Sequence, residues 1–341
     1  MNNVNVAVIG AGRMGWLHAG NFHGKVSKGK VAAVVDQNKE SADKLGSHLG
    51  AEVFSQVDDI LMRPDIHAIC ISTPIGTHKE LSLKALKAKK HVFCEKPLTL
   101  TVADAEEIAA AVKESGCCYQ LGFMSRFDDA FEAAKEALEQ GVVGTPVFIR
   151  STSRDPGLPP VPGWGANPEA CGDISFELCS HDYDRMCWLM DDKVRKVYAQ
   201  AGILSSKDVA ARCGGKMIND TLVINMEFCK GALGSVDGLL NIKYGYDARV
   251  EVVGDEGVIV IGDMGHVDVI SANKSKKLSV PASPSFIDRF KHAYVKEAQH
   301  FIDCIIEHRN PKVGAEDGLQ AVKIAAAVNK SIQLGQSVLI D

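Results

Sequence analysis

The sequence predicts an α/β domain with a parallel sheet, followed by an α+β domain built on an open, mostly antiparallel sheet. Over the first third, short apolar runs alternate with amphipathic segments of about 10 to 15 residues. Longer strand-like runs then follow one another. At 341 residues the chain also exceeds the usual size of one domain. We place the domains at 1–122 and 123–341, and leave open that the C-terminal segment packs back on the first domain.

Composition excludes several classes of partner. The chain is 46% hydrophobic and 24% charged, as in ordinary globular proteins. Its formal net charge of -5 offers no basic face for nucleic acid. No apolar run approaches the roughly 20 residues that cross a bilayer, and the start MNNVNVAVIG lacks a basic signal-peptide region. We therefore expect a cytoplasmic protein without a membrane partner, whose ten scattered cysteines are free thiols.

The first domain is expected to alternate strand and helix throughout. Expected strands are 4–9, 31–35, 52–54, 68–71, 91–94 and 118–121, and expected helices are 58–61, 77–88 and 102–115. A further helix is expected around Ala42, Leu45 and Leu49, and another follows the glycines of residues 10–15 and runs through Asn21. Strands that take turns with helices indicate a parallel sheet with helices on both faces.

A glycine motif, GAGRMG at residues 10–15, follows the first expected strand and opens a helix. The GxGxxG pattern alone is weak evidence, but Asp36 ends the second strand at about the 20-residue spacing of dinucleotide-binding domains. Gly10 permits a tight turn, and Gly12 lets the backbone approach a pyrophosphate. Gly15 lets the helix pack on the strand. The first domain is therefore expected to be a Rossmann domain that binds a dinucleotide.

The acidic residue at the end of the second strand favours NAD. The Asp36 carboxylate can accept hydrogen bonds from both hydroxyls of the adenosine ribose, and its charge repels a 2'-phosphate. Gln37 and Asn38 supply no cation for such a phosphate. Arg13, inside the glycine loop, keeps NADP open as the alternative, since its side chain could reach a 2'-phosphate.

The second domain contains longer strand patterns. Expected strands are 146–153, 194–202, 220–228, 232–240, 248–253 and 258–261, and expected helices are 129–138, 176–190, 287–307 and 315–333. Turn signals such as Lys230-Gly231 between consecutive runs suit an antiparallel sheet. The proline- and glycine-rich stretch 154–172 is expected to be a functional loop over a cleft.

Glu177 and His181 lie four residues apart in the expected helix 176–190, so both should project from one face. A carboxylate beside an imidazole raises its pKa and orients its ring, as a general base requires. A solvated ion pair is the structural alternative. Metal binding with Asp184 is another, but no second histidine stands at ligand spacing, so we expect no metal.

The stretch HVFCEKPLTL, residues 91–100, places a lysine where a strand ends. Ligands bind at the carboxyl ends of strands in an open parallel sheet. Lys96 is therefore expected to point into the crevice where a nicotinamide would lie. Pro97 either fixes a turn or takes the cis form.

These pieces resemble the glucose-fructose oxidoreductase / inositol dehydrogenase / MocA (Gfo/Idh/MocA) family over essentially the whole chain. The shared motifs are VAVIGAGRMG, Ser72-Thr73-Pro74 ahead of Thr77-His78, Glu95-Lys96-Pro97, and Glu177 to His181 followed by Asp182. The strings GFMSRF at 122–127, RSTSRDP at 150–156, KYGYD at 243–247, and Arg289-Phe290 with Ala293-Tyr294 are most similar to inositol 2-dehydrogenases. The family also implies a homo-oligomer, commonly a tetramer formed through the second domain's sheet, with a dimer as the alternative.

The resemblance implies roles for individual residues. Lys96 would hydrogen-bond the hydroxyl that is oxidised, and His181 would be the general base. Glu177 stands where inositol dehydrogenases usually have aspartate, and the extra methylene moves the carboxylate relative to substrate or histidine. The implied cofactor contacts are Gly10, Gly12, Arg13, Met14, Gly15, Asp36, Ser72, Thr73, Pro74, His78, Glu95 and Lys96. The implied substrate contacts are Lys96, Arg126, Asp155, Glu177, His181, Tyr244 and Tyr294.

Together, the residues and the resemblance predict an NAD-dependent dehydrogenase that oxidises a secondary hydroxyl of a cyclic polyol or sugar, inositol-like, to a ketone by hydride transfer. Two alternatives remain. One is an NADP(H)-dependent reductase of a keto-sugar. The other is a non-catalytic NAD-binding regulator of the same fold, which would not need Lys96 and His181 together.

Overall fold

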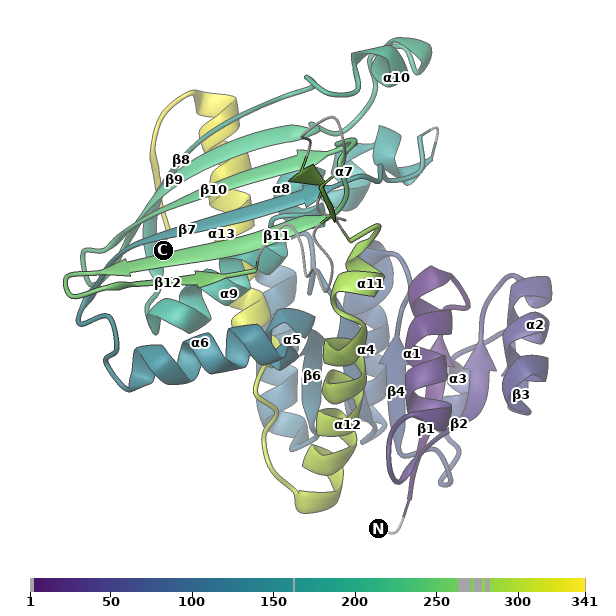
Figure 1. Ribbon diagram of the computed structural model, residues 1–341. Coiled ribbons are helices and arrows are strands. Elements are labelled where there is room, and N and C mark those ends of the chain that lie inside the picture. Colours follow the sequence, from purple (N-terminus) through teal and green to yellow (C-terminus); the bar gives the residue numbers. More distant parts are fainter. Residues whose placement is uncertain (1–2, 162, 263–270, 273–277, 280–282, 341) are drawn as a thin grey trace. The chain divides into compact units, whose positions relative to one another are not determined.

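The computed structural model describes residues 3–161, 163–262, 271–272, 278–279 and 283–340 (Figure 1). Contacts divide the chain into two compact units. The first unit comprises Met1–Phe127 and His292–Val322, and the second comprises Asp128–Lys291 and Lys323–Asp341. The chain thus contributes two separate segments to each unit.

The first unit contains a six-stranded parallel sheet in the order β3-β2-β1-β4-β5-β6. Its strands are β1 Val4–Ile9, β2 Gly29–Val35, β3 Glu52–Phe54, β4 Ala68–Ile71, β5 His91–Glu95 and β6 Tyr119–Gly122. Its helices include α1 Arg13–Gly24, α2 Lys39–Leu49, α3 Asp58–Leu61, α4 His78–Lys87, α5 Val102–Ser115 and α12 Lys291–Glu307. The strand order reverses between β1 and β4, which creates the topological switch point where such sheets bind ligands. The predicted parallel sheet is confirmed.

Local sequence signals set the ends of several helices in this unit. The Asn38 side chain accepts a hydrogen bond from the Ser41 amide at the start of α2, and the Thr101 hydroxyl accepts one from the Asp104 amide at the start of α5. Such N-caps satisfy amides that have no partner inside the helix. Gly50 ends α2 and Gly116 ends α5, both with left-handed backbone angles.

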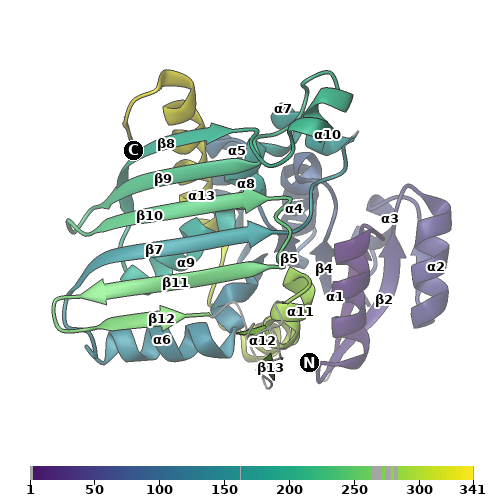
Figure 2. The same cartoon turned by 45° about the horizontal axis from the view of Figure 1, so that its top comes forward.

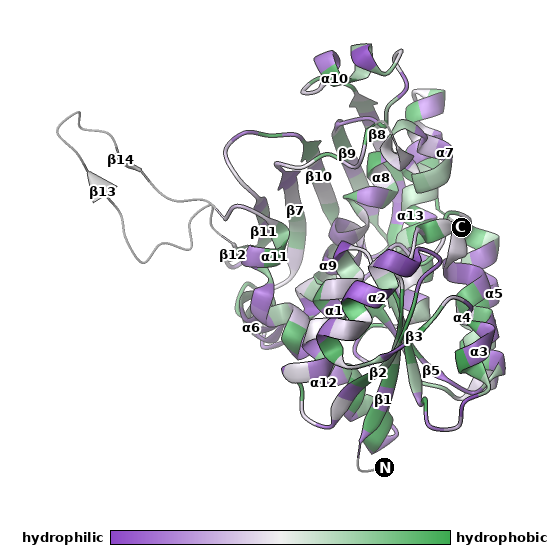
Figure 3. Ribbon diagram, turned by 90° about the vertical axis from the view of Figure 1, so that its right-hand side faces the viewer, coloured by the Kyte–Doolittle hydropathy of each residue, from purple (hydrophilic) through white to green (hydrophobic). Residues whose placement is uncertain are grey.

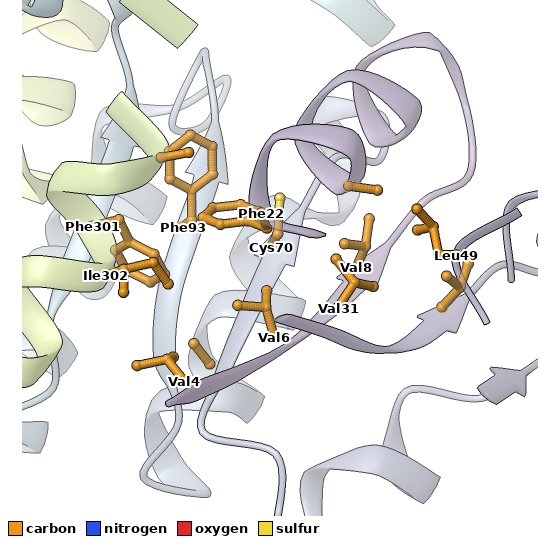
Figure 4. Packing of buried hydrophobic residues seen from close by; sticks show 14 of the residues in the cluster. Val4, Val6, Val8, Phe22, Val31, Leu49, Cys70, Phe93, Phe301 and Ile302 are labelled. Atoms are coloured by element: carbon orange, nitrogen blue, oxygen red, sulfur yellow. The ribbon is translucent and has the colours of Figure 1, made fainter. Parts of the chain in front are cut away.

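The core of the first unit joins segments far apart in the sequence (Figure 4). Phe93 of β5 packs edge-on against Phe22 of α1 and Phe301 of α12, at ring-centroid distances of 5.7 Å and 5.8 Å. Such aromatic contacts add about 0.5 to 1.5 kcal/mol each beyond the burial of their surface. Helix α12 is therefore part of the hydrophobic core beneath the parallel sheet.

The second unit is built on a seven-stranded sheet in the order β12-β11-β7-β10-β9-β8-β15. Its strands are β7 Pro146–Asp155, β8 Val194–Gly202, β9 Thr221–Phe228, β10 Leu233–Leu240, β11 Asp247–Gly254, β12 Val258–Ile261 and β15 Val338–Leu339. Strands β7 and β10 pair in parallel, and the other described pairs are antiparallel. The predicted open, mostly antiparallel sheet is confirmed, with one parallel pair that makes it mixed.

Helices of the second unit lie on one face of this sheet. They include α6 Asp129–Glu139, α8 Asp173–Glu177, α9 Ser180–Met190 and the later part of α13 Ala315–Leu334. Figure 2 shows α9 and α13 behind the strands, while the near face of the sheet carries no helix in the part of the chain that is described. Shorter elements are α7 Pro168–Cys171, α10 Lys207–Arg212, α11 Phe286–Arg289 and the strands β13 Ser271–Ala272 and β14 Leu278–Ser279.

Two predicted helices are each divided in the structure. The predicted helix 176–190 forms α8 and α9, separated by Leu178 and Cys179, and the predicted helix 287–307 forms α11 and α12. The amides of Leu178 and Cys179 both donate to the carbonyl of Ile174, at 3.0 Å and 3.2 Å, which interrupts the helical ladder. This turn packs on β10 so closely that a Cβ at Gly238 would lie 2.5 Å from the Cys179 sulfur. Packing between elements decides the break, which the apolar periodicity could not reveal.

Hydropathy follows the layers of the fold. Figure 3 shows hydrophobic residues concentrated on the central strands and on the inner stripes of the helices. In the described part of the chain, no helix combines the length and the apolar character needed to cross a membrane.

Candidate functional site

The glycine loop between β1 and α1 has the geometry of a phosphate cradle. Gly10 has a φ of +98°, and a Cβ there would lie 2.6 Å from the Ser72 carbonyl oxygen. A Cβ at Gly15 would lie 1.9 Å from the Gly10 carbonyl oxygen. By contrast, no described protein atom lies within 4 Å of a Cβ placed at Gly12. Gly10 and Gly15 are thus required by the protein itself, whereas the open space at Gly12 fits the close approach of a ligand.

Two predicted cofactor residues of this loop begin α1. Arg13 is exposed and Met14 is half-buried. Both lie in the first turn, where helix amides and the helix dipole favour an anion. The residues present therefore fit a dinucleotide whose pyrophosphate lies at this helix end.

Asp36 lies directly after β2, as predicted, and also supports the glycine loop. One carboxylate oxygen accepts from the Ala11 amide at 2.6 Å, and the other accepts from the Asn38 amide at 2.8 Å. A carboxylate has about four acceptor positions, so both oxygens retain capacity for the hydroxyls of a ribose. The two hydrogen bonds from backbone amides fix the orientation of the Asp36 carboxylate.

The segment Ser72-Thr73-Pro74 follows β4, on the other side of the switch point from the glycine loop. The Ser72 amide donates to the Ile9 carbonyl at 2.8 Å, which holds the two strand ends together. The Thr73 hydroxyl lies 2.6 Å from the Thr77 hydroxyl, which also donates to the Pro74 carbonyl. The segment is thus a braced turn beside the glycine loop.

His78 is buried and connects two turns of the first unit. Its Nδ1 lies 2.9 Å from the Pro97 carbonyl oxygen, and its Nε2 lies 2.9 Å from the Thr73 carbonyl oxygen. Both partners can only accept, so both ring nitrogens must carry a proton and donate. The imidazole is therefore positively charged. Burial opposes the charge, but the Cys94 sulfur and the two carbonyls outweigh it and raise the pKa of His78 to about 9. Both ring nitrogens thus hold the turns of Thr73 and Pro97, and contact of His78 with a cofactor stays a prediction.

The turn after β5 presents Lys96, as predicted from the end of that strand. Lys96 is half-buried, and its peptide bond to Pro97 is cis. Glu95 is buried beneath it: one carboxylate oxygen lies 2.5 Å from His18 Nε2, and the other accepts from the Lys96 amide at 3.1 Å. Burial would raise the pKa of Glu95, but His18 and Lys96 outweigh it and lower the pKa. Glu95 thus holds the backbone of Lys96 through one oxygen and is itself held by His18 through the other.

His18 is a residue of this network that the sequence analysis did not identify. It lies fully buried in α1, with its ring 4.8 Å from that of Phe93 and 6.0 Å from that of Tyr294. A lone histidine on a buried helix face gives no signal of its partner. Only the fold brings α1 against the end of β5.

In the second unit, Glu177 and His181 are more exposed than the residues around them. Every residue from Ile174 to Met186 is buried except these two, which are both half-buried. Glu177 ends α8 and His181 lies in the first turn of α9, so they do not share one continuous helix as predicted. Both side chains are nevertheless partly exposed to solvent, as the spacing of four residues predicts for positions on the same side.

The residue after His181 anchors its helix to the sheet. Asp182 is buried, and its carboxylate accepts from the Ser151 and Ser153 hydroxyls of β7 at 2.6 Å and 3.1 Å and from the Arg185 guanidinium. Arg185 in turn donates to both serines. This buried ion pair with its hydrogen bonds fixes the first turn of α9 and thereby the backbone of His181. The predicted motif included Asp182, but nothing in the sequence indicated Arg185 as its partner.

Tyr244 and Asp155, two predicted substrate residues, lie near the ends of β11 and β7. Tyr244 is 44% exposed, and its hydroxyl donates to Asp247 at 3.0 Å and accepts from Arg154 at 3.1 Å. Arg154 also pairs with Asp237 of β10 at 2.7 Å. Asp155 accepts from the Gly157 amide at 2.6 Å. Sequence alternation could not have shown that Arg154, Asp237 and Asp247 form one network across three strands.

Arg126 and Tyr294, also predicted as substrate contacts, are largely buried in the first unit. The Arg126 guanidinium pairs with Asp317 at 2.7 Å and donates to the Lys312 carbonyl at 2.9 Å. Tyr294 is only 4% exposed and lies against the His18 ring. These contacts give both residues a structural role, so we keep substrate contact by either as a prediction only.

Two family models match the chain and together cover most of it. The model described as oxidoreductase family, NAD-binding Rossmann fold, matches residues 4–123. The model described as oxidoreductase family, C-terminal alpha/beta domain, matches residues 135–340. The two matches fall on the parallel sheet and on the mixed sheet described above.

Curated proteins and solved structures of similar length resemble the chain from end to end. Myo-inositol 2-dehydrogenase of Thermotoga maritima is 31% identical over 339 residues, covering 99% of both chains. The scyllo-inositol 2-dehydrogenase (NAD(+)) of Bacillus subtilis is 34% identical over 343 residues, covering 100% of this chain and 97% of the other. The structure of scyllo-inositol dehydrogenase from Lactobacillus casei with bound cofactor NAD(H) and scyllo-inositol aligns with a TM-score of 0.91 at 28% identity, covering 99% of both chains.

Proposed function

Because the chain belongs to the Gfo/Idh/MocA family of NAD-binding oxidoreductases, we propose that it is a dehydrogenase that oxidises a secondary hydroxyl of an inositol-like cyclic polyol to a ketone. The observation that carries the proposal is the position and partial exposure of its two acid–base groups, Lys96 and His181. Lys96 stands at the carboxyl end of β5 on a turn held by Glu95, and His181 is one of two partly open residues in an otherwise buried segment. The names of the similar proteins supply the substrate class.

The residues of the first unit would hold NAD. The glycine loop and the start of α1 would bind the pyrophosphate, and Asp36 would accept hydrogen bonds from the adenosine ribose. When bound, NAD supplies the acceptor for the hydride that leaves the substrate carbon. Glu95 would hold the turn of Lys96, and His78 would hold the turn of Thr73. Both would thereby position the site without contacting the cofactor.

The chain's own side chains would carry the proton chemistry. His181 accepts the proton of the substrate hydroxyl, and Glu177 orients its ring or the substrate. The Lys96 ammonium stabilises the negative charge that develops on the oxygen as the proton leaves. A donor positioned in this way contributes about 2 to 4 kcal/mol to lowering the barrier. The proposal requires that the two side chains reach one hydroxyl.

The direct test is a panel of inositols, hexoses and aminosugars assayed for NADH formation, with Lys96→Met as the variant. We expect oxidation of a cyclic polyol, a fall in kcat of roughly 100- to 1,000-fold in the variant, and little change in NAD affinity. Lys87→Met, which changes an exposed lysine at the end of α4, is the matched control and should retain activity. A silent panel with NAD still bound would instead favour a non-catalytic regulator.

The reductase alternative depends on cofactor choice. The Asp36 carboxylate lies at the end of β2, where it would repel a 2'-phosphate, whereas Arg13 is exposed in the glycine loop, two residues after the Ala11 amide that donates to Asp36. We expect the NAD dissociation constant to be lower than that of NADP. The reverse order would support the keto-sugar reductase.

We also propose that the protein forms a homo-oligomer, either a tetramer or a dimer, through the helix-free face of the second unit's sheet. Apolar side chains on its strands are exposed, including Val223 at 48%, Leu233 at 55% and Val258 at 55%. Exposed apolar groups on neighbouring strands are typical of an association surface. Light scattering that gives the mass of one chain, 36.6 kDa, at micromolar concentration would contradict this proposal.

A further inference from the structure

The turns after β4 and β5 are neighbours at the carboxyl edge of the parallel sheet, where the proposed site lies. Pairing between the two strands runs as far as Ile71 and Cys94. Beyond these residues, the first turn carries Thr73, a predicted cofactor contact, and the second turn carries Lys96. The distance between a bound cofactor and the lysine ammonium therefore depends on how the two turns are held relative to each other beyond the strand pairing.

His78 links the two turns, because its ring lies between them. Its Nδ1 lies 2.9 Å from the carbonyl oxygen of Pro97, the residue after Lys96, and its Nε2 lies 2.9 Å from the Thr73 carbonyl oxygen. His78 is only 1% exposed, so bulk water does not compete for either hydrogen bond. Two hydrogen bonds from opposite sides of a rigid ring fix the separation of the two carbonyl groups.

The turn that carries His78 is itself rigidly held. His78 begins α4 directly after Thr77. The Thr77 hydroxyl donates to the Pro74 carbonyl at 2.8 Å and lies 2.6 Å from the Thr73 hydroxyl. The hydrogen bond from His78 to Pro97 therefore connects a braced turn, rather than one flexible side chain, to the segment that carries the lysine.

This bridge requires a charged imidazole. Carbonyl oxygens can only accept, so both ring nitrogens of His78 must donate. Burial opposes the charge, but the Cys94 sulfur and the two carbonyls outweigh it and raise the pKa of His78 to about 9. Hydrogen bonds from a charged donor are roughly twice as strong as those between neutral groups. A neutral ring would leave one of the two carbonyls without its donor.

The backbone on the other side of Lys96 is held independently. The Glu95 carboxylate accepts from the Lys96 amide at 3.1 Å, and its other oxygen lies 2.5 Å from His18 of α1. His78 of α4 holds the backbone beyond the lysine, at the Pro97 carbonyl. The segment that carries Lys96 is thus fixed on both sides by helices that follow two different strands.

We propose that His78 is a positioning residue that connects the turn of Thr73 to the turn of Lys96 and thereby places the lysine ammonium relative to the bound cofactor. This role rests on the proposed dehydrogenase activity. His78 acts through two carbonyl groups and not on the substrate. The two hydrogen bonds serve different functions, because one holds the turn on the cofactor side and the other holds the turn that carries the acid–base group.

Asparagine and glutamine separate the two hydrogen bonds. The amide nitrogen of asparagine can replace Nδ1 of a histidine, and that of glutamine can replace Nε2, so His78→Asn keeps the donor for Pro97 and His78→Gln keeps the donor for Thr73. We expect His78→Gln to lower kcat for polyol oxidation roughly 10- to 100-fold, with the NAD dissociation constant within about 3-fold, because small displacements of a catalytic group have such effects. His78→Asn should instead raise the NAD dissociation constant roughly 10-fold, with the smaller loss of kcat.

His308→Asn is the matched control, because His308 is an exposed histidine of the same unit. Neither kcat nor the NAD dissociation constant should change in this variant. Equal losses of rate and of NAD affinity in both His78 variants would mean that His78 only stabilises the unit as a whole, and would overturn the proposal. Unchanged constants in both variants would overturn it as well.

Nuclear magnetic resonance tests the bridge in the unmodified protein without turnover. With isotope-labelled histidine, the ring signals that disappear in His78→Gln should show both nitrogens protonated at neutral pH. One unprotonated ring nitrogen under these conditions would contradict the bridge. Absence of polyol oxidation would contradict the proposed function alone, because the protonation of the ring and the effect of His78→Asn on NAD affinity are both measured without turnover.

Discussion

At the residue scale, Glu95 shows how the fold gives partners within the protein to a residue that its motif predicts at the cofactor. The strand-end motif was predicted to place both Glu95 and Lys96 at the cofactor. The structure buries the Glu95 carboxylate between His18 and the Lys96 amide. The Glu95 carboxylate thus helps to position Lys96. We propose that Lys96 in turn acts on the substrate.

Glu95→Gln distinguishes a role of Glu95 in positioning Lys96 from a role in contacting the cofactor. The substitution removes the charge that pairs with His18 but keeps an acceptor for the Lys96 amide. We expect kcat for polyol oxidation to fall roughly 10- to 100-fold, because a shift of about 1 Å in a catalytic group has that effect, while the NAD dissociation constant stays within a few-fold. Calorimetric titration of NAD beside steady-state kinetics measures both.

Glu114→Gln is the control for this variant, since Glu114 is an exposed residue of α5 and should change neither constant. If Glu95→Gln weakened NAD binding in proportion to the loss of rate, direct cofactor contact would be the better account of Glu95.

At the scale of single elements, the break between α8 and α9 shows tertiary packing acting on a helix. The pattern from 176 to 190 is compatible with one helix, yet the chain turns at Leu178 and Cys179 where it meets Gly238 of β10. The glycine is what allows the turn and the strand to approach so closely. The position of His181 therefore depends on a residue of another element.

Gly238→Ala should destabilise the second unit. The added Cβ would lie 2.5 Å from the Cys179 sulfur, so the turn or the strand must move, and overpacking of this kind costs about 1 to 3 kcal/mol. The free energy of unfolding in urea measures the effect, and His181-dependent activity should fall with it.

Gly20→Ala provides the opposite case within α1. No described atom lies within 4 Å of a Cβ there, and alanine favours the helix by about 0.5 to 1 kcal/mol. This variant should therefore be slightly more stable than the parent. Equal destabilisation by both substitutions would show that the close approach at Gly238 is not the cause.

At the scale of the whole molecule, the proposed mechanism draws one group from each unit. Lys96 belongs to the unit with the parallel sheet, and His181 belongs to the unit with the mixed sheet. If both act on one hydroxyl, their contributions to the rate should not be independent, because groups that act as a set give strongly non-additive losses.

The double variant Lys96→Met/His181→Asn tests this requirement. We expect it to be about as slow as the slower single variant, rather than slower by the product of the two effects. The comparison needs kcat and KM for all four proteins with one polyol. Fully multiplicative losses would mean that the two side chains act in separate steps or on separate atoms.

Much of the fold follows from local properties that the sequence contains. The alternation of apolar runs with amphipathic segments predicted the parallel sheet, and the spacing of GxGxxG with Asp36 predicted NAD binding; the strand order and the family comparisons confirm both. The family resemblance is likewise confirmed. Individual contacts at the substrate side stay predictions, because side chains such as Tyr244 and Asp155 carry no local pattern that fixes their partners.

The sequence by itself determined the strands, most helices, the glycine turn and the acidic residue after β2, because backbone preference and apolar period act over a few neighbouring residues. Only the tertiary structure decided that Glu95 pairs with His18 and that the turn between α8 and α9 packs on Gly238. Each of these depends on the packing of segments that are dozens of residues apart, and no periodicity records which distant residue will fill the space beside a side chain.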